Sequence, residues 1–214
     1  MKLHLGCGQI YLDGYINIDY PLDHHSVQTK SVADKLADIT KLKYKKGSIS
    51  EVRLHHVFEH FDRSTACALL ALWSSWLINY GLVRIEVPDY ARTSASVFSP
   101  FTSKKVKSIG MRHIFGSQEA EWAVHYYGWT ETSLSELYKL LGFEIVSIKK
   151  NSWKGTFNIE ITGKKVTSLS KQAAIKACTK WLSQFMVDDS KGEKSLLNYW
   201  SGISKKQLET GWAK

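Results

Sequence analysis

A short apolar run enters a glycine turn near the start of the sequence and sets strong limits on the fold. Residues 3–8 read Leu-His-Leu-Gly-Cys-Gly, a pattern typical of a strand that ends in a turn. Two glycines without a Cβ allow the backbone of such a turn to approach a ligand closely. Asp19 ends the next alternating segment, where an acidic side chain can accept hydrogen bonds from both hydroxyls of a ribose. The pattern predicts a nucleoside-binding turn, although a plain tight turn and a turn-forming aspartate fit the same residues.

The spacing within this pattern discriminates between cofactors. A dinucleotide-binding fingerprint needs a third glycine and an acidic residue about 20 positions further on. Here Tyr11 stands at the third glycine position, and Asp19 follows Gly8 by only 11 residues. That segment is too short for a full helix whose N-terminus would bind a pyrophosphate. Because S-adenosylmethionine carries a ribose and an adenine but no phosphate, the spacing favours it over a dinucleotide.

Apolar periodicity predicts an α/β architecture. Strands are predicted at residues 2–5, 15–19, 37–39, 51–55, 82–87, 143–149 and 156–162. A helical repeat covers residues 63–80, and a second helix is predicted at 130–141. The helix between two strands indicates parallel pairing, whereas the short connection between the last two strands favours an antiparallel pair. Residues 90–128 lack clear periodicity and are interpreted as a lid or an insertion.

Composition excludes several classes of protein. Hydrophobic residues make up 43% of the chain and charged residues 23%, which excludes disorder of the whole chain. Cys7, Cys67 and Cys178 are too few and too widely spaced for a disulfide framework or a structural zinc site. No apolar signal region precedes the first predicted strand, and the longest mostly apolar stretch, residues 66–78, is too short to span a bilayer. We therefore expect a cytoplasmic protein without a membrane span.

Several segments occur in an order and spacing that are more specific than any one of them. They are residues 5–8 (Leu-Gly-Cys-Gly) with 14–19 (Gly-Tyr-Ile-Asn-Ile-Asp), 38–42 (Asp-Ile-Thr-Lys-Leu), 55–61 (His-His-Val-Phe-Glu-His-Phe), 82–89 (Leu-Val-Arg-Ile-Glu-Val-Pro-Asp) and, more loosely, 128–145. In these segments the sequence resembles class I S-adenosylmethionine-dependent methyltransferases, in particular their short bacterial type. The resemblance covers residues 3–150.

The resemblance implies a Rossmann-like α/β fold, with a mainly parallel seven-stranded sheet and a C-terminal antiparallel pair of strands. A C-terminal helical extension is predicted beyond the part of the chain that the resemblance covers. The resemblance also implies S-adenosylmethionine as the cofactor and a methyltransferase domain at residues 1–163. The cofactor-binding residues that it implies are Leu5, Gly6, Cys7, Gly8, Asp19, Asp38, Ile39 and His55. The glycine turn would line the methionyl part, Asp19 would hold the ribose, and Asp38 with Ile39 would lie at the adenine edge. Because the sequence begins at the first strand, the helix that many relatives place before it is expected to be absent.

Methyl transfer is an in-line displacement, so such an enzyme chiefly positions the acceptor against the sulfonium. An oxygen acceptor also benefits from a base, for which histidine is suited near neutral pH. The candidate catalytic residues are His56, which the resemblance places near the transferred methyl group, and His125 in the segment 90–128. His56 and His60 share the spacing of a zinc-protease helix, but Glu59 is misplaced for that motif, so no metal is predicted.

The predicted function is methyl transfer to an oxygen of a sugar, a glycan or a small metabolite. The sequence lacks an Asn-Pro-Pro-Tyr type motif after the fourth predicted strand, where residues 55–58 read His-His-Val-Phe. This absence argues against amino methylation of nucleic-acid bases. Two alternatives stay open: a methyltransferase-like binding module without catalysis, and a nucleic-acid methyltransferase that uses a basic C-terminal segment. The oligomeric state is not predicted.

The C-terminal extension, residues 164–214, carries most of the net charge of +9, because residues 163–214 hold ten lysines and only four acidic residues. This excess suits a nucleic acid or an anionic surface, but a solvated helical face explains it equally well. The apolar positions Ala174, Cys178, Trp181 and Phe185 form one stripe. The stripe predicts a helix that packs on the domain or on a second copy, followed by a tryptophan-bearing tail.

Overall fold

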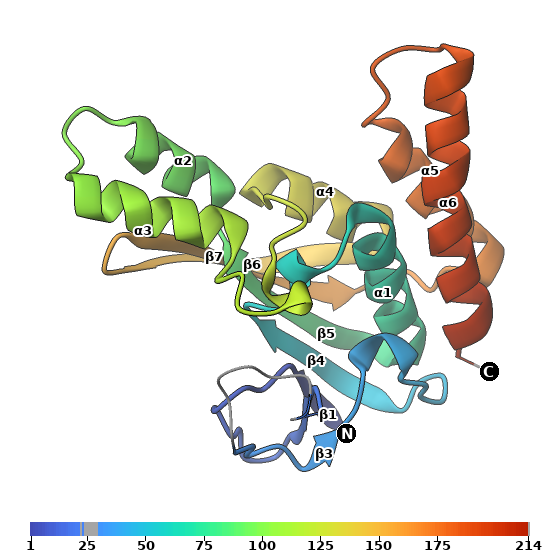
Figure 1. Cartoon of the computed structure of the whole chain (residues 1–214). Helices are drawn as coiled ribbons and strands as arrows, with labels where there is room; N and C mark the ends of the chain where they lie inside the picture. Colours follow the sequence, from blue (N-terminus) through green and yellow to red (C-terminus); the bar gives the residue numbers. More distant parts are fainter. Residues whose placement is uncertain (22, 24–29, 214) are drawn as a thin grey trace.

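The computed structural model describes residues 1–21, 23 and 30–213, whose strands form one seven-stranded sheet (Figure 1). The strands are β1 (Lys2–Leu5), β2 (Ile16–Asp19), β3 (Lys35–Leu36), β4 (Ile49–His55), β5 (Leu77–Pro88), β6 (Phe143–Trp153) and β7 (Thr156–Lys165). Their order across the sheet is β3-β2-β1-β4-β5-β7-β6. Strands β1 to β5 pair in parallel, whereas β7 runs antiparallel to both β5 and β6. The predicted mainly parallel sheet with a C-terminal antiparallel pair is therefore confirmed.

The helices gather mainly on one face of this sheet. They are α1 (Arg63–Trp76), α2 (Tyr90–Phe98), α3 (Lys104–Phe115), α4 (Glu131–Leu140), α5 (Lys171–Ser183) and α6 (Lys191–Gly211). Figure 1 shows α1, α4, α5 and α6 on the same side of the sheet, whereas α2 and α3 pack against each other and contact β7. None of the described helices combines the length and the apolar character that crossing a bilayer requires.

Apolar and charged side chains alternate along the central strands, and the apolar ones face the helices in the hydrophobic core. Val52 and Leu54 of β4 and Val83 and Ile85 of β5 are fully buried in one apolar cluster with the helices. Side chains at alternate positions of a strand point to opposite faces, so the intervening positions lie away from that cluster. These intervening positions carry charged side chains, which makes the opposite face of the sheet polar.

The C-terminal helices complete the same core. Cys178 and Trp181 of α5 and Leu208 of α6 are buried in the cluster that also contains the strands. The Ser204 hydroxyl of α6 donates a hydrogen bond of 2.8 Å to the carbonyl oxygen of Ser64 in α1. The predicted packing of the C-terminal amphipathic helix on the domain is confirmed. The predicted tail, however, forms a second helix, because α6 finds its own apolar surface on α1 and α5.

The position of the third strand was predicted incorrectly. It was expected to end at residues 37–39, but β3 ends before them, and only its two residues pair with β2. Asp38 instead begins the short 3₁₀ helix η2 (Ile39–Lys41), where its Oδ1 accepts a hydrogen bond from the backbone N–H of Thr40. The capping capacity of an aspartate outweighs a weak strand preference at this position.

The C-terminal boundary of the helix predicted at residues 63–80 was also wrong. Helix α1 begins after the N-cap residue Asp62 and ends at Trp76. Leu77 has extended backbone and pairs with Ile49 of β4, so β5 begins five residues earlier than predicted. Because Leu77 is buried in the strand, it fits the apolar repeat of a helix without belonging to one.

Residues 90–128 contain regular structure that the sequence did not predict. Helix α2 buries only Thr93 and Val97, and α3 buries only Gly110. Such narrow buried stripes leave most positions exposed, so no clear hydrophobic period develops. A Cβ at Gly110 would clash with the Val97 side chain, so glycine permits the close packing of α2 against α3.

Candidate functional site

A cavity of about 1140 Å³ opens where β1, β2, β3 and β4 end. Six of the predicted cofactor-binding residues line it: Gly6, Cys7, Gly8, Asp38, Ile39 and His55. The other two, Leu5 and Asp19, are absent from its wall as far as the described residues define it. Leu5 is fully buried in the core, and Asp19 is 5% exposed. The carboxyl ends of parallel strands meet at one edge of a sheet, which is where ligands bind in open α/β folds.

The glycine turn after β1 has the left-handed backbone that its sequence suggests. Gly6 and Gly8 have φ angles of +66° and +55°, which glycine adopts without steric cost. The backbone N–H groups of Gly6 and Cys7 both donate to the carbonyl oxygen of Ile18, at 2.8 and 3.1 Å. A Cβ added at Gly6 would clash with Val57, whereas one added at Gly8 would meet open space. Gly6 is therefore required for packing, and Gly8 leaves room at the cavity wall.

Two aspartates lie near this turn in different environments. The Asp19 Oδ1 accepts a hydrogen bond of 2.9 Å from the backbone N–H of Tyr20, and Tyr20 itself lines the cavity. The Asp38 Oδ1 accepts hydrogen bonds from the backbone N–H and the hydroxyl of Thr40, at 2.9 and 2.6 Å. Burial raises the pKa of Asp38, but these hydrogen bonds and nearby Lys41 outweigh it and leave the pKa below its usual value. Asp38 thus presents a carboxylate at the cavity.

The cysteine in the glycine turn is not activated. Burial and, to a smaller extent, the negative charge of Asp19 raise the pKa of the Cys7 thiol to about 11. A thiol that stays protonated at neutral pH is a poor nucleophile. Cys7 is therefore not a candidate for covalent chemistry.

A second cavity of about 600 Å³ adjoins the first. His56, His60 and Trp122 line both cavities, so a ligand in one reaches the boundary of the other. The second cavity is lined largely by α3, by the segment that follows α3 and by the strands β6 and β7. Its lining includes Arg112 of α3 and His125. The segment 90–128 therefore forms one wall of the second cavity, and its role as a lid remains a prediction.

His56 lies at the junction of the two cavities. It has a φ of +53°, a left-handed conformation that is uncommon outside glycine and that often accompanies functional sites. Its Nδ1 lies 3.3 Å from Oε1 of Glu59, and its Nε2 lies 3.4 Å from Oε1 of Glu86. Burial lowers the pKa of His56, but the two carboxylates outweigh burial and raise the pKa to about 10. The side chain is then an imidazolium near neutral pH and has no lone pair with which to accept a proton.

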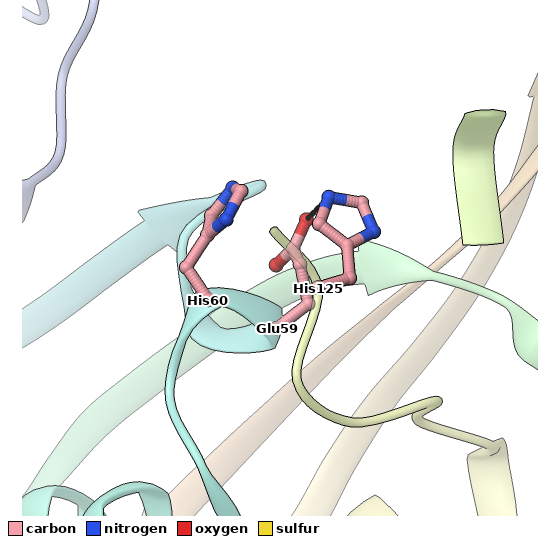
Figure 2. Close-up of side chains that lie close together, drawn as sticks. All are labelled: Glu59, His60 and His125. Carbon is pink, nitrogen blue, oxygen red and sulfur yellow. Dashed lines mark ion pairs between the residues drawn. The ribbon is translucent and has the colours of Figure 1, made fainter. Parts of the chain in front are cut away.

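Glu59, His60 and His125 converge on the wall of the second cavity (Figure 2). Glu59 and His60 belong to the 3₁₀ helix η3 (Phe58–His60), whereas His125 follows η4 (Glu121–Ala123). Each residue offers one possible ligand atom, and these atoms lie within 4.8 Å of one another. This group could not be predicted from the sequence, because His60 and His125 are 65 positions apart. A His-x-x-Glu-His sequence directly after a strand was the only local signal.

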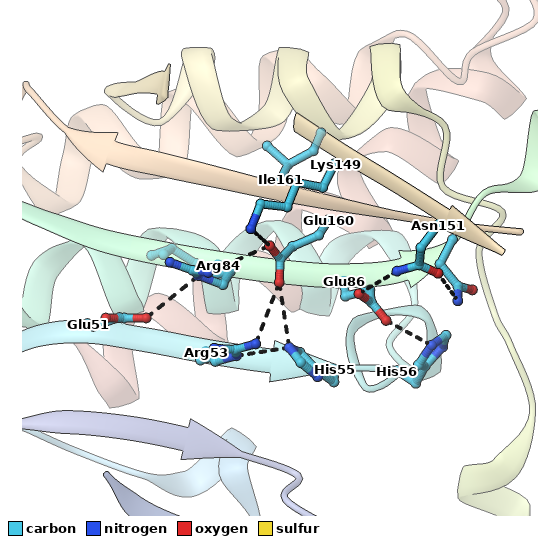
Figure 3. Close-up of polar contacts among 12 residues, drawn as sticks. Glu51, Arg53, His55, His56, Arg84, Glu86, Lys149, Asn151, Glu160 and Ile161 are labelled. Atoms are coloured by element: carbon cyan, nitrogen blue, oxygen red, sulfur yellow. Dashed lines mark hydrogen bonds and ion pairs between the residues drawn. The ribbon is translucent and has the colours of Figure 1, made fainter. Parts of the chain in front are cut away.

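A polar network on the face of the sheet opposite the hydrophobic core adjoins the two cavities (Figure 3). Glu160 of β7 lies at its centre, with guanidinium nitrogens of Arg53 and Arg84 each 3.7 Å from its carboxylate. His55 Nε2 also lies 3.7 Å from Glu160 and 2.9 Å from Arg53 Nε. The network therefore holds the imidazole of His55, a wall residue of the first cavity, in a fixed orientation.

Replacing the central carboxylate of this network is expected to destabilise the fold in a pH-dependent way. Contacts with His55, Arg84 and Arg53 lower the pKa of Glu160, against burial, which raises it. The stabilisation is therefore present above the unfolded pKa of 4.5 and is lost as the pH falls through the lower folded value. We expect Glu160→Gln to reduce the free energy of unfolding at pH 7 by about 1–3 kcal/mol, since it removes the negative charge that faces the partly buried Arg53 and Arg84. Urea titrations at pH 7 and pH 3 measure this difference, which should shrink at pH 3.

Glu144→Gln is the matched control for Glu160→Gln. Glu144 lies on the neighbouring strand and pairs with Lys164 at 2.8 Å, but its side chain is 56% exposed. An exposed pair contributes little, so the control is expected to change the free energy of unfolding by less than about 1 kcal/mol. Equal effects of the two substitutions at pH 7 would contradict a stabilising role of the network.

The same arrangement of strands and helices is known from solved structures of other proteins. The chain shares the Rossmann-like fold of solved S-adenosylmethionine-dependent methyltransferases, with a mainly parallel sheet and one antiparallel strand, β7. Comparison with protein-family models gives no match, and comparison with curated proteins gives none either.

Three solved methyltransferases illustrate the shared fold. An S-adenosylmethionine-dependent methyltransferase from Archaeoglobus fulgidus is 17% identical, with a TM-score of 0.53 over 77% of this chain and 85% of that one. The 1,6-didemethyltoxoflavin-N1-methyltransferase of Burkholderia thailandensis, solved with bound 1,6-didemethyltoxoflavin and S-adenosylhomocysteine, is 14% identical, with a TM-score of 0.52 over 78% of this chain and 71% of that one. A methyltransferase from Mesorhizobium loti is 11% identical, with a TM-score of 0.52 over 77% and 90%. At these identities the likeness establishes the fold.

Proposed function

We propose that the chain is an S-adenosylmethionine-dependent methyltransferase that acts on an oxygen of a sugar, a glycan or a small metabolite. One observation carries this proposal: the cavity lined by the predicted cofactor residues adjoins a second, smaller cavity through His56, His60 and Trp122. A methyl donor and an acceptor need two such adjoining compartments, because the reacting atoms must meet in line.

The first cavity has the features that S-adenosylmethionine requires. Gly8 leaves space beside the backbone of the turn, and Asp38 presents a carboxylate that can accept hydrogen bonds from the cofactor. No full helix separates β1 from β2, so the turn offers no extended N-terminus for a pyrophosphate. We assign the methionyl part to residues 6–8 and the adenine edge to Asp38 and Ile39. Asp19 is not assigned to the ribose, because it is 5% exposed and does not line the cavity in the described part of the chain.

The second cavity suits a small, hydroxylated acceptor. Trp122 and Trp153 offer aromatic surfaces on which a sugar ring can stack, and Arg112 and Asn158 offer polar groups. The Nδ1 of His125 lies 3.0 Å from the carbonyl oxygen of His113 and donates to it, which leaves Nε2 as an acceptor. We assign to this Nε2 the removal of a proton from the acceptor hydroxyl, and we assign to the imidazolium of His56 a positioning role.

Transfer of a labelled methyl group tests this function. The chain is incubated with methyl-labelled S-adenosylmethionine and separate panels of saccharides, small hydroxylated metabolites, RNA and DNA. We expect label on a hydroxylated small molecule or saccharide, and we expect His125→Gln to lower kcat by roughly 10²–10⁴-fold without weakening S-adenosylhomocysteine binding. Label on nucleic acid alone would overturn the acceptor class. Cofactor binding without transfer to any panel would identify a non-catalytic binding module.

A further inference from the structure

We propose that Glu59, His60 and His125 form a binding site for a divalent transition-metal ion on the wall of the second cavity. Two imidazoles and one carboxylate are a ligand set that recurs in catalytic zinc and non-haem iron sites. Their possible ligand atoms already lie within 4.8 Å of one another, and Oε1 of Glu59 lies 3.9 Å from Nε2 of His125.

Hydrogen bonds to the backbone prepare both histidines for a metal. The Nδ1 of His60 lies 3.1 Å from the carbonyl oxygen of Val124, and the Nδ1 of His125 lies 3.0 Å from that of His113. A carbonyl oxygen only accepts, so both Nδ1 atoms carry the proton and both Nε2 atoms keep a lone pair. Histidines that ligate metals nearly always donate their other ring N–H in this way.

The buried carboxylate of Glu59 faces the imidazole of His56 but accepts no hydrogen bond from the described residues. The residue is 1% exposed, and neither of its side-chain oxygens has a hydrogen-bond partner in the described part of the chain. The imidazole of His56 lies 3.3 Å from Oε1, which is an ion-pair contact and not a hydrogen bond. A buried carboxylate without hydrogen bonds is costly, and a metal ion would supply the missing contact.

The donor set indicates which ions the site would take. Two imidazole nitrogens favour Zn²⁺, Fe²⁺, Co²⁺ or Mn²⁺ over Mg²⁺ and Ca²⁺, which prefer an all-oxygen environment. Bonds of about 2.0–2.2 Å place ligand atoms roughly 3–3.5 Å apart, so small side-chain rotations must close the present gaps. Three protein ligands leave at least one open coordination position, as catalytic sites do.

The open position adjoins the space that we assign to the acceptor. If the proposed function is correct, an acceptor oxygen bound to the ion would lose its proton more easily, because the metal lowers its pKa. The ion would then replace His125 as the activating group, since one Nε2 lone pair cannot both ligate a metal and accept a proton. Metal binding itself does not depend on methyl transfer.

Cobalt titration of the whole chain tests the site without any activity assay. The chain is freed of metal with a chelator and titrated with Co²⁺ while the visible d–d absorption is followed, and Zn²⁺ is then added as a competitor. We expect one Co²⁺ per chain, displaced by Zn²⁺. We expect Glu59→Gln, His60→Ala and His125→Ala each to raise the Kd for Co²⁺ at least about 100-fold, more than the loss of an outer-shell partner.

His113→Asn is the matched control, because His113 lines the same cavity but lies outside the group of three. Its Nε2 already lies 3.1 Å from the carbonyl oxygen of Phe157, to which it donates. We expect this variant to keep the Co²⁺ affinity of the wild-type chain. Equal losses in His113→Asn and in the ligand variants, or no Co²⁺ binding by the wild-type chain, would overturn the site.

A measurement on the wild-type chain covers the case in which a ligand variant fails to fold. Long-range ¹H–¹⁵N spectra report the ring nitrogens of each histidine directly. We expect Zn²⁺ to shift the Nε2 signals of His60 and His125 and to leave the ring of His4, which lies outside the proposed site, unchanged. Unshifted signals of His60 and His125 in the presence of saturating Zn²⁺ would contradict the ligand assignment.

Discussion

Trp181→Ala is expected to lower the free energy of unfolding by about 3–5 kcal/mol, the usual cost of deleting a buried tryptophan side chain. Trp181 lies in α5 and is 1% exposed. Its ring stacks on Trp129 with 5.8 Å between the ring centroids and an angle of 15°, and Phe185 contacts it edge-on at 5.0 Å. Because Trp129 also stacks on Phe58 of η3, the substitution removes support close to the second cavity.

The matched control is Trp153→Ala, which deletes the same side chain from an exposed position. Trp153 ends β6 and is 67% exposed. Its contact with the Lys154 ammonium, 4.5 Å from the ring centroid, lies at the surface. We expect a change of less than about 1 kcal/mol in urea unfolding of this control. Similar stability of the wild-type and Trp181→Ala chains would mean that α5 is an appendage and not part of the core.

Gly8→Ala is expected to weaken the binding of S-adenosylhomocysteine by roughly 10- to 100-fold. A Cβ added at Gly8 meets no protein atom within 4 Å, so it would occupy room at the cavity wall that we assign to the cofactor. Overpacking of this kind costs about 1–3 kcal/mol. The positive φ of +55° adds strain that affects stability rather than binding. Isothermal titration calorimetry measures the binding, and thermal unfolding measures the strain.

Gly47→Ala separates these two effects. Gly47 has a φ of +67°, and a Cβ there also meets open space, but the residue lies in an exposed loop away from the cavity. We therefore expect a similar loss of stability in the two variants and normal S-adenosylhomocysteine binding only in Gly47→Ala. Normal binding by Gly8→Ala would place the cofactor elsewhere.

The central strands could be predicted from the sequence because their burial is unambiguous. Residues such as Val52 and Leu54 alternate with charged neighbours, and glycine or proline residues lie at the ends of several strands. The glycine turn was likewise predictable, since few residues besides glycine adopt its backbone. Six cofactor candidates consequently reach the same cavity wall.

Features that depend on distant parts of the chain could not be predicted in the same way. Helices α2 and α3 bury too few residues to produce a period. Leu77 is equally apolar in a helix or a strand, and its partner Ile49 lies 28 residues away. The meeting of His60 with His125 is set by backbone contacts, such as the N–H of Tyr126 with the carbonyl oxygen of Glu59 at 2.9 Å. No local spacing encodes such contacts.

Calorimetric titration of the wild-type chain with S-adenosylhomocysteine tests most directly whether this fold is used for methyl transfer. The titration is repeated with NADH, which carries the pyrophosphate that the short β1–β2 connection disfavours. We expect one S-adenosylhomocysteine bound per chain at submillimolar concentration and no comparable binding of NADH. Absence of S-adenosylhomocysteine binding at millimolar ligand, or NADH binding of equal strength, would contradict the assignment of the cavity.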